Sequence, residues 1–323
     1  MHSLRASIGL APFALIFAIA APALAADSPF GAEPRTRPAE WRITYRGRPV
    51  MVYSCAPEKY KPYVKELCTV NGDNVLRDAP HDHLHHHALM YGIRVNGLNF
   101  WEEAPGSGVQ KSVSMAEPEI RVGAGGQPEA VLRQTIHWVE PADAFLPDTP
   151  RVALLVEQRT LTLTVDEARQ EVALQWTSAF EVGAKTNQVV LTGSTYHGLG
   201  IRFLQDLDPV AAHLNAGGKP DLGDNRQDVS VHRWGSVAFD RPGKPATLVL
   251  YGDPANARGR ANYFSMRTPF AYLSATQGLD KEPLVYRSGE RFQIQYLVLL
   301  SSKLLDPGAI EQRGEAWRAG RTR

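Results

Sequence analysis

Five of the ten histidines of this 323-residue chain lie within seven residues, in the stretch HDHLHHH. Neutral imidazole transfers protons near pH 7, and it also binds transition metals. The cluster therefore indicates acid–base chemistry or a metal site, and a solvated polar loop is the alternative without a function. The five residues are His81, His83, His85, His86 and His87.

The cluster comes directly before a predicted strand. On an extended chain, His83, His85 and His87 share one face and His86 lies on the other. We predict His83, His85 and His86 as catalytic acid–base residues, with His81 and His87 more tolerant of substitution. If a carboxylate joins His83 and His85, the same residues form a metal site instead.

Glu157 is the predicted acidic partner of these histidines. It lies inside the apolar run VALLVEQRTLTLTV, and a buried carboxylate needs a partner or a function. We predict Glu157 as a catalytic residue, or as the third ligand of the alternative metal site with His83 and His85. An ion pair with Arg159 or a charge on a neighbouring strand is the structural alternative.

Five further residues have side chains suited to a sugar. Arg202 interrupts an apolar strand, and its planar fork matches a carboxylate or a pair of hydroxyl groups. His197 lies in a glycine-rich turn, and Asn256 and Tyr263 lie in a segment rich in amide, arginine and aromatic side chains. Trp101 offers a ring face for stacking. We predict all five as substrate-binding residues.

The composition excludes several other functions. The net charge is +1, which does not favour a nucleic-acid or anionic lipid surface. The motifs G-x-S-x-G, the P-loop and C-x-x-C are all missing from the sequence. We predict a small-molecule or oligosaccharide substrate, no membrane insertion, and no cofactor. One transition-metal or divalent ion is the alternative cofactor.

The start of the chain is typical of an exported protein. Residues 1–25 combine Arg5, an apolar run and the cleavage site Ala23-Leu24-Ala25, as in a signal peptide. We therefore expect a periplasmic or secreted protein, with residues 26–40 as an exposed lead-in. In an oxidising compartment, Cys55 and Cys68 are predicted to form a disulfide.

The rest of the chain predicts an all-β fold. Apolar residues recur with a period of two, and glycine, proline, asparagine and aspartate separate the runs. Asn96-Gly97 is a strong hairpin signal, and Asp306-Pro307 is a typical helix start. We predict a single large antiparallel β-sandwich over 41–305, followed by a C-terminal helix and tail over 306–323.

Several motifs resemble the PmoA family of exported bacterial proteins. They are Pro62-Tyr63, the D-H-x-H-H segment at 82–86, V-N-G-x-x-F-W at 95–101, and the stretches GLGIRF, DPAN, RTPFAYLSA and GERFQIQYLVLL. Where a basic residue is expected after the histidine pair, this chain has His87. The resemblance implies a sandwich like that of galactose mutarotase, and a role in processing sugars or oxidised sugars.

Together these features predict an exported carbohydrate-active enzyme. The reaction is elimination, hydration or epimerisation of a sugar or a keto glycoside. A metal-dependent enzyme on the same sandwich is one alternative, and a non-catalytic carbohydrate-binding protein is another. Methane oxygenase activity is not expected, although the name PmoA also denotes a subunit of the particulate methane enzyme. That subunit spans the membrane, whereas no stretch after the predicted signal peptide approaches ~18 apolar residues.

Overall fold

The computed structural model describes residues 28–36, 39–141, 152–224 and 226–320. The chain is 52% strand and 7% helix, which confirms the prediction of an all-β sandwich. The predicted signal peptide, residues 1–25, lies outside the described residues. Across those four ranges, none of the helices has the length and apolar character needed to span a membrane.

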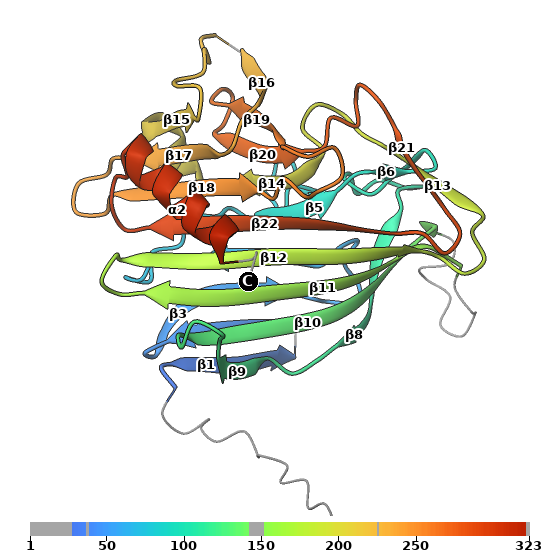
Figure 1. Cartoon of the computed structure of the whole chain (residues 1–323), viewed down its shortest axis with the longest axis horizontal. Coiled ribbons are helices and arrows are strands. Elements are labelled where there is room, and N and C mark those ends of the chain that lie inside the picture. The colour runs from blue at the N-terminus through green and yellow to red at the C-terminus, as the bar shows by residue number, and fades with distance from the viewer. Residues whose placement is uncertain (1–27, 37–38, 142–151, 225, 321–323) are drawn as a thin grey trace, which may run out of the picture.

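Two nine-stranded antiparallel sheets form the sandwich (Figure 1). In spatial order, sheet I contains β1 (Phe30–Thr36), β2 (Ala39–Tyr45), β3 (Arg48–Ser54), β4 (Tyr63–Leu67), β5 (Leu89–Gly92), β14 (Gly198–Arg202), β20 (Tyr272–Thr276), β19 (Asn262–Met266) and β16 (Gln227–Val231).

Sheet II contains the longest strands of the protein. In spatial order it is β15 (Ala211–Asn215), β17 (Gly235–Phe239), β18 (Ala246–Gly252), β22 (Arg291–Ser301), β12 (Glu171–Val182), β11 (Ala153–Asp166), β10 (Pro128–Val139) and β8 (Val109–Met115), with β9 (Glu119–Val122) also paired to β10. A smaller sheet, sheet III, is formed by β21 (Leu284–Arg287), β13 (Gln188–Thr192), β6 (Arg94–Val95) and β7 (Leu98–Asn99).

The main hydrophobic core lies between sheets I and II. Side chains alternate between the two faces of a strand, so the central strands of sheet I have residues in this core and residues on the outer face. In β5, Leu89 and Tyr91 point into the core, while Met90 belongs to a separate cluster on the outer face. In β20, Leu273 is a core residue and Tyr272 belongs to the outer cluster. Sheet I therefore has a second apolar surface on its outer face.

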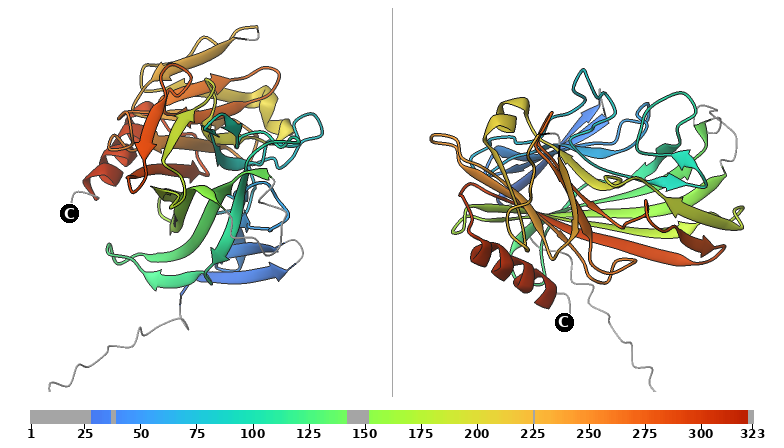
Figure 2. Two further views of the ribbon diagram at one scale, coloured as in Figure 1. Left: turned by 90° about the vertical axis from the view of Figure 1, so that its right-hand side faces the viewer. Right: turned by 90° about the horizontal axis from the view of Figure 1, so that it is seen from above.

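The only helix longer than a 3₁₀ turn in the described ranges is α2 (Pro307–Ala319), which covers the outer face of sheet II (Figures 1 and 2). Its N-cap is Asp306, whose side chain accepts a hydrogen bond from the backbone N of Ala309 at 2.8 Å. A short 3₁₀ helix, η1 (Gln205–Val210), follows β14. The helix start predicted at Asp306-Pro307 is confirmed.

Two local predictions can be compared directly with the structure. Asn96 and Gly97 have positive φ angles of 50° and 83° and connect β6 to β7 as a hairpin, as predicted. The lead-in predicted over 26–40 forms strands in its described part, and its residues 33–36 are exposed. Strand β1 pairs with β2 along its whole length, because the run from Phe30 to Thr36 has an available partner at the edge of sheet I.

Candidate active site

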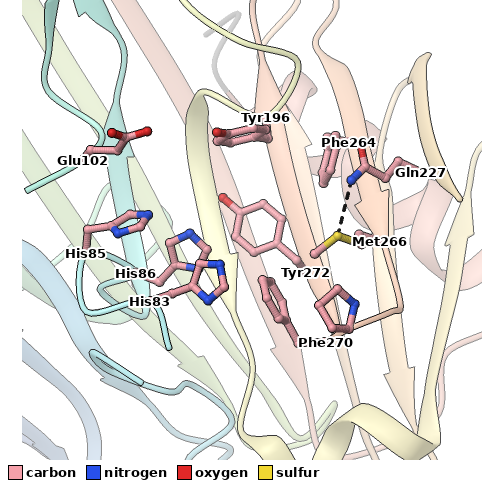
Figure 3. A pocket seen from close by; sticks show the side chains of 11 residues that line it. His83, His85, His86, Glu102, Tyr196, Gln227, Phe264, Met266, Phe270 and Tyr272 are labelled. Carbon is pink, nitrogen blue, oxygen red and sulfur yellow. Dashed lines mark hydrogen bonds between the residues drawn. The ribbon is translucent and has the colours of Figure 1, made fainter. Parts of the chain in front are cut away.

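A cavity of about 380 Å³ lies on the outer face of sheet I (Figure 3). One side of the cavity is polar and is formed by His83, His85, His86 and Glu102. The opposite side is mostly apolar and is formed by Tyr196, Gln227, Phe264, Met266, Pro269, Phe270 and Tyr272. The cavity therefore joins the loop between β4 and β5 to strands β16, β19 and β20, which come much later in the chain.

The histidine loop is held by successive turns and is not extended. The backbone N of His83 donates to Pro80 O, and the backbone N of His86 donates to His83 O, both at 2.9 Å. The turns bring the His83 and His86 rings to a centroid distance of 4.6 Å, and the His85 and His86 rings to 4.5 Å. The strand-like alternation predicted for these residues is thus wrong, although the three predicted histidines do meet in one cavity.

Burial controls the charge of these imidazoles. Removal from water disfavours the charged form of histidine. It lowers the pKa of His86 to about 2, with help from the neighbouring His85 and His83. The pKa of half-buried His85 is lowered chiefly by burial, and also by the charge of Lys61. Both rings are therefore neutral at pH 7, and the more exposed ring of His85 is the better placed of the two to take a proton from a bound molecule.

Glu102 is the carboxylate of the cavity. It follows β7, where Asn99 Oδ1 accepts hydrogen bonds from the backbone N of Trp101 at 2.9 Å and of Glu102 at 3.2 Å. This turn ends the strand and directs Glu102 toward the cavity, beside His85 (Figure 3). The charge of Glu102 also acts on His85, where it favours the protonated form.

The aromatic side of the cavity packs closely on sheet I. The ring of Phe270 lies 5.1 Å from that of His83, and the ring of Tyr272 lies 5.8 Å from that of His86. Gly200 in β14 makes this packing possible. A Cβ atom at Gly200 would lie 2.0 Å from the Tyr272 hydroxyl oxygen and 2.5 Å from the Trp101 ring, so a larger residue there would displace both side chains.

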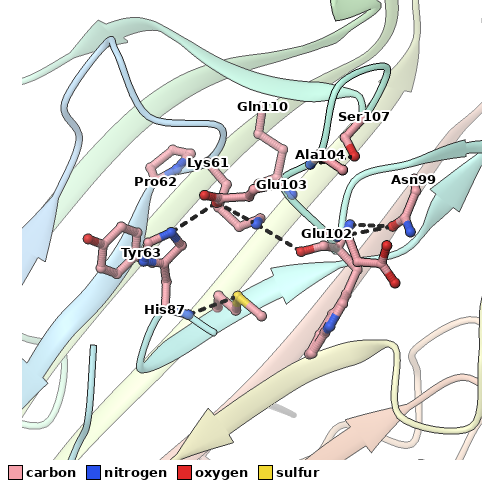
Figure 4. A network of polar contacts seen from close by, with 12 residues as sticks. Lys61, Pro62, Tyr63, His87, Asn99, Glu102, Glu103, Ala104, Ser107 and Gln110 are labelled. Atoms are coloured by element: carbon pink, nitrogen blue, oxygen red, sulfur yellow. Dashed lines mark hydrogen bonds and ion pairs between the residues drawn. The ribbon is translucent and has the colours of Figure 1, made fainter. Parts of the chain in front are cut away.

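A buried network of charges lies next to the cavity (Figure 4). His87 contacts Asp78 through Nδ1 at 2.7 Å and Glu103 through Nε2 at 2.9 Å. Lys61 Nζ donates to Glu103 at 2.8 Å and to Trp101 O at 2.9 Å. This network connects the histidine loop with the segment that carries Glu102. It corrects the expectation that His87 tolerates substitution, because His87 is buried between two carboxylates.

The pKa values within the network follow from these contacts. Burial lowers the pKa of His87, but hydrogen bonds to Asp78 and Glu103 outweigh burial and raise it above the usual value. Burial raises the pKa of Glu103, but His87 and Lys61 outweigh it and lower the pKa to about 2. His87 and Glu103 are therefore held as an ion pair, in contrast to the neutral rings of His85 and His86.

The structure corrects the prediction for Glu157, which it places away from the cavity. Glu157 is 0% exposed and lies in the core between the two sheets. Its carboxylate accepts hydrogen bonds from Trp138 Nε1 at 2.8 Å, Arg159 Nε at 2.7 Å and Ser178 Oγ at 2.6 Å. The ion pair with Arg159, the structural alternative, explains the buried charge.

The alternative metal site predicted from His83, His85 and Glu157 does not form, because Glu157 lies in the core between the sheets and away from the two histidines. Across residues 28–36, 39–141, 152–224 and 226–320, no group of three or more histidine, cysteine, aspartate or glutamate side chains is arranged to hold a metal ion.

Three of the predicted substrate-binding residues lie just behind the cavity wall. Trp101 is fully buried and stacks on His197, with ring centroids 5.2 Å apart. Burial, with a contribution from the charge of Arg94, lowers the pKa of His197 to about 3. Arg202 lies beneath the ring of Phe270, with its guanidinium carbon 3.2 Å from the ring centroid.

The other two predicted substrate-binding residues have structural roles. Asn256 exchanges two hydrogen bonds with the backbone of Gln295, at 2.9 and 2.7 Å. The Tyr263 hydroxyl accepts a hydrogen bond from the backbone N of Gly252 at 2.8 Å, and its ring lies in the main core. Neither residue lines the cavity, so both predictions are corrected.

The predicted disulfide is also wrong, because Cys55 and Cys68 are free thiols. The backbone N of Cys68 bonds to Val50 O, whereas Cys55 directly follows β3, five residues further along. At ~3.3 Å per residue the two cysteines lie roughly 16 Å apart along the β3–β4 pair, far beyond the ~4.4–6.8 Å Cα separation of a disulfide.

Sequence reasoning missed most of the aromatic wall. Phe264 and Met266 alternate with core residues on β19, and Tyr272 does so on β20. Their period-two pattern identifies them as strand residues. Both faces of these two strands are apolar, and this is the one sequence signal that the outer face of sheet I also packs against other side chains.

Solved structures of similar fold include three bacterial enzymes. The GH36 alpha-galactosidase AgaB from Geobacillus stearothermophilus matches with a TM-score of 0.51 and 10% identity, over 84% of this chain and 41% of that chain. The GH36 alpha-galactosidase AgaA A355E D478A from the same organism, in complex with stachyose, matches with a TM-score of 0.43 and 10% identity, over 83% of this chain and 40% of that chain. The alpha-galactosidase from Lactobacillus brevis matches with a TM-score of 0.40 and 8% identity, over 84% of this chain and 39% of that chain.

This chain thus spans about two-fifths of the length of those enzymes, and at such identity the likeness to AgaB is one of fold. No curated protein matches the chain. The resemblance to the PmoA family stays a prediction. One family model, described as a family of unknown function (DUF6807), matches residues 40–315, and the chain therefore belongs to this family.

Proposed function

We propose that the protein is an enzyme that transfers protons to or from a sugar, or an oxidised sugar, bound in this cavity. The observation that carries the proposal is the meeting of three imidazoles and one carboxylate with an aromatic wall in a single cavity of about 380 Å³. Small-molecule sites typically measure ~300–1,000 Å³ and combine apolar walls with a few convergent polar groups.

The aromatic wall supports a sugar as the ligand. Sugar rings have apolar faces formed by C–H groups and polar edges formed by hydroxyl groups. Tyr196, Phe264 and Tyr272 offer ring surfaces to such a face, while the histidines and Glu102 on the other side offer hydrogen-bond partners to the edge. The fold shared with AgaB, a GH36 alpha-galactosidase, is consistent with a carbohydrate ligand.

His85 is the general base of the proposed reaction. Its ring is neutral at pH 7 and partly exposed, it lines the cavity, and the His86 ring packs against it with a centroid distance of 4.5 Å. Glu102 stabilises the imidazolium that forms when His85 takes a proton. In an elimination the His85 imidazolium then gives this proton to the departing oxygen, and in a hydration the same steps run in reverse. An epimerisation needs a second proton donor on the opposite face of the sugar carbon.

The test is a screen of purified protein against glycosides and their 3-keto derivatives. His85→Ala should lower turnover by ~10²–10⁴-fold, the typical contribution of an acid–base group. His81→Ala is the matched control, since His81 is exposed on the same loop and does not line the cavity. The melting temperature of both variants should stay close to that of the native protein.

Other outcomes of the screen identify the alternatives. Full turnover in His85→Ala would remove this residue from the mechanism. Sugar binding without turnover of any compound would make the protein a carbohydrate-binding module. Loss of activity with a chelator, and its return with a transition metal, would replace the acid–base reaction with metal-dependent chemistry.

A further inference from the structure

Arg202 differs from the other buried cations of the protein. Three lysine or arginine side chains are buried in the described part of the chain, namely Lys61, Arg159 and Arg202. Lys61 is paired with Glu103 at 2.8 Å, and Arg159 with Glu157 at 2.7 Å. Arg202 is 2% exposed, but its Nε and Nη1 atoms are buried without a hydrogen-bond partner.

The surroundings of Arg202 do not neutralise its charge by contact. Asp208 and Asp82 act on it through their charges alone, and Asp208 accepts instead from the backbone N of Ala271 at 2.8 Å. Burial is the dominant effect and lowers the pKa of Arg202 to about 10. A buried and unpaired cation is costly, and such a cost is typical of a group kept for binding.

The Phe270 ring lies between this guanidinium and the cavity. One face of the Phe270 ring lies over Arg202, with the guanidinium carbon 3.2 Å from its centroid, and the ring also lines the cavity. His83 lies 5.1 Å from the same ring on the cavity side. Phe270 is 5% exposed and follows the exposed segment 267–269, so access from the cavity to the guanidinium requires the Phe270 side chain to rotate.

We propose that Arg202 is an anion subsite of this cavity and that the substrate is a sugar acid, whose carboxylate moves the Phe270 ring aside and pairs with the guanidinium. The arginine fork binds a carboxylate through two parallel hydrogen bonds. This inference rests on the proposed function, and it names the substrate class.

The distribution of charge in the cavity fixes how such a substrate lies. Glu102 and Phe270 are on opposite sides of the cavity (Figure 3). The charges of Asp208 and Asp82 also reach Arg202, so a carboxylate is held there only if its two hydrogen bonds to the guanidinium outweigh their repulsion. A sugar carboxylate is repelled by Glu102 and attracted by Arg202. The rest of the sugar ring then extends past His83 and His86 toward His85.

The test compares each sugar acid with its neutral counterpart by calorimetry. D-galacturonate is paired with D-galactose, and D-glucuronate with D-glucose. In at least one pair, the acid should bind the native protein ten times more tightly or better. Arg202→Gln should remove this preference and leave the affinity for the neutral sugar within about twofold, while Arg202→Lys should keep part of it. Equal binding of acid and neutral sugar to the native protein would overturn the proposal.

Arg267→Gln is the matched control. It removes the same charge from an exposed position three residues from Phe270, and it should keep the preference for the acid. The melting temperature of Arg202→Gln should fall only slightly, because the side chain loses its contact with the Phe270 ring and no hydrogen bond. A large fall, or an equal loss of affinity for acid and neutral sugar, would make Arg202 a structural residue and overturn the subsite.

A second experiment separates the subsite from the proposed function. Phe270→Leu removes the flat ring that covers Arg202, so acetate should raise the melting temperature of this variant above its value in sodium chloride of equal ionic strength. The double variant Phe270→Leu/Arg202→Gln should not respond. If no sugar binds but acetate has this effect, the subsite stands and the proposed function falls. If acetate has no effect, the subsite falls.

Discussion

Glu157→Gln tests whether the carboxylate of Glu157, which is 0% exposed, has a structural role. The substitution keeps the size of the side chain and removes its charge. Arg159, 1% exposed, then loses its counter-charge, and the hydrogen bonds at 2.7 and 3.1 Å from its Nε and Nη2 atoms weaken. Removing one partner of a buried ion pair typically costs ~3–5 kcal/mol, because the other charge stays buried and unpaired.

This loss is large enough to measure by thermal unfolding. At ~2–4 °C per kcal/mol for a large domain, the melting temperature should fall by roughly 6–20 °C. Glu181→Gln is the matched control on the neighbouring strand. Glu181 and Arg291 form an ion pair of similar length, 2.9 Å, but their side chains are 46% and 75% exposed, so the expected cost is ~0–1 kcal/mol.

A double variant identifies the cause of the loss. Adding Arg159→Met to Glu157→Gln removes the charge that is left unpaired and should recover part of the stability. Arg159 also donates to Pro62 O at 2.9 Å, so the recovery is incomplete. The reasoning is refuted if Glu157→Gln leaves the melting temperature unchanged and abolishes turnover, since Glu157 would then act in the reaction and not in the core.

Three further predictions concern acid, thiols and export. Burial lowers the pKa of three histidines, to about 2 in His86, about 3 in His197 and about 4 in His213. Below about pH 6.5 the unfolded chain therefore binds protons that the folded chain does not. Stability should fall by up to ~1.4 kcal/mol per pH unit for each of them, and a melting temperature that is flat from pH 7 to pH 5 would contradict this. Thiol titration of the denatured, unreduced chain should find two free groups, Cys55 and Cys68, and a count of zero would restore the disulfide. N-terminal sequencing of the native protein should find a chain that begins at or near Ala26, and an intact Met1 would exclude the predicted cleavage.

The features that the sequence predicts well are local. The hairpin at Asn96-Gly97 and the helix start at Asp306-Pro307 depend on backbone angles and caps that a few adjacent residues determine. Period-two patterning identifies strands because one face of each strand must be buried. These signals suffice for an all-β sandwich, but they do not say which strands become neighbours.

The contents of the cavity depend on those long-range neighbours. The histidine loop meets Tyr272 because β5 pairs with β14 and β14 with β20, and no local pattern specifies this order. The sequence pattern predicts Glu157 in the cleft, because a charge inside an apolar strand has the same appearance whether its partner is a substrate or a protein side chain. The position of Arg159, two residues along the same face, was the signal that favoured the structural interpretation.

The five histidines also show why residue type alone does not determine a role. His86 and His87 are adjacent and both are buried. The His86 ring lies among other imidazoles, whereas the His87 ring lies between two carboxylates. Neighbouring imidazoles and burial keep His86 neutral, while Asp78 and Glu103 hold His87 as a cation. The charged network at His87 fixes the end of the loop and the segment carrying Glu102, so the neutral rings face the cavity. A cluster of this kind needs both environments, because proton transfer requires a neutral base and its loop requires a rigid attachment.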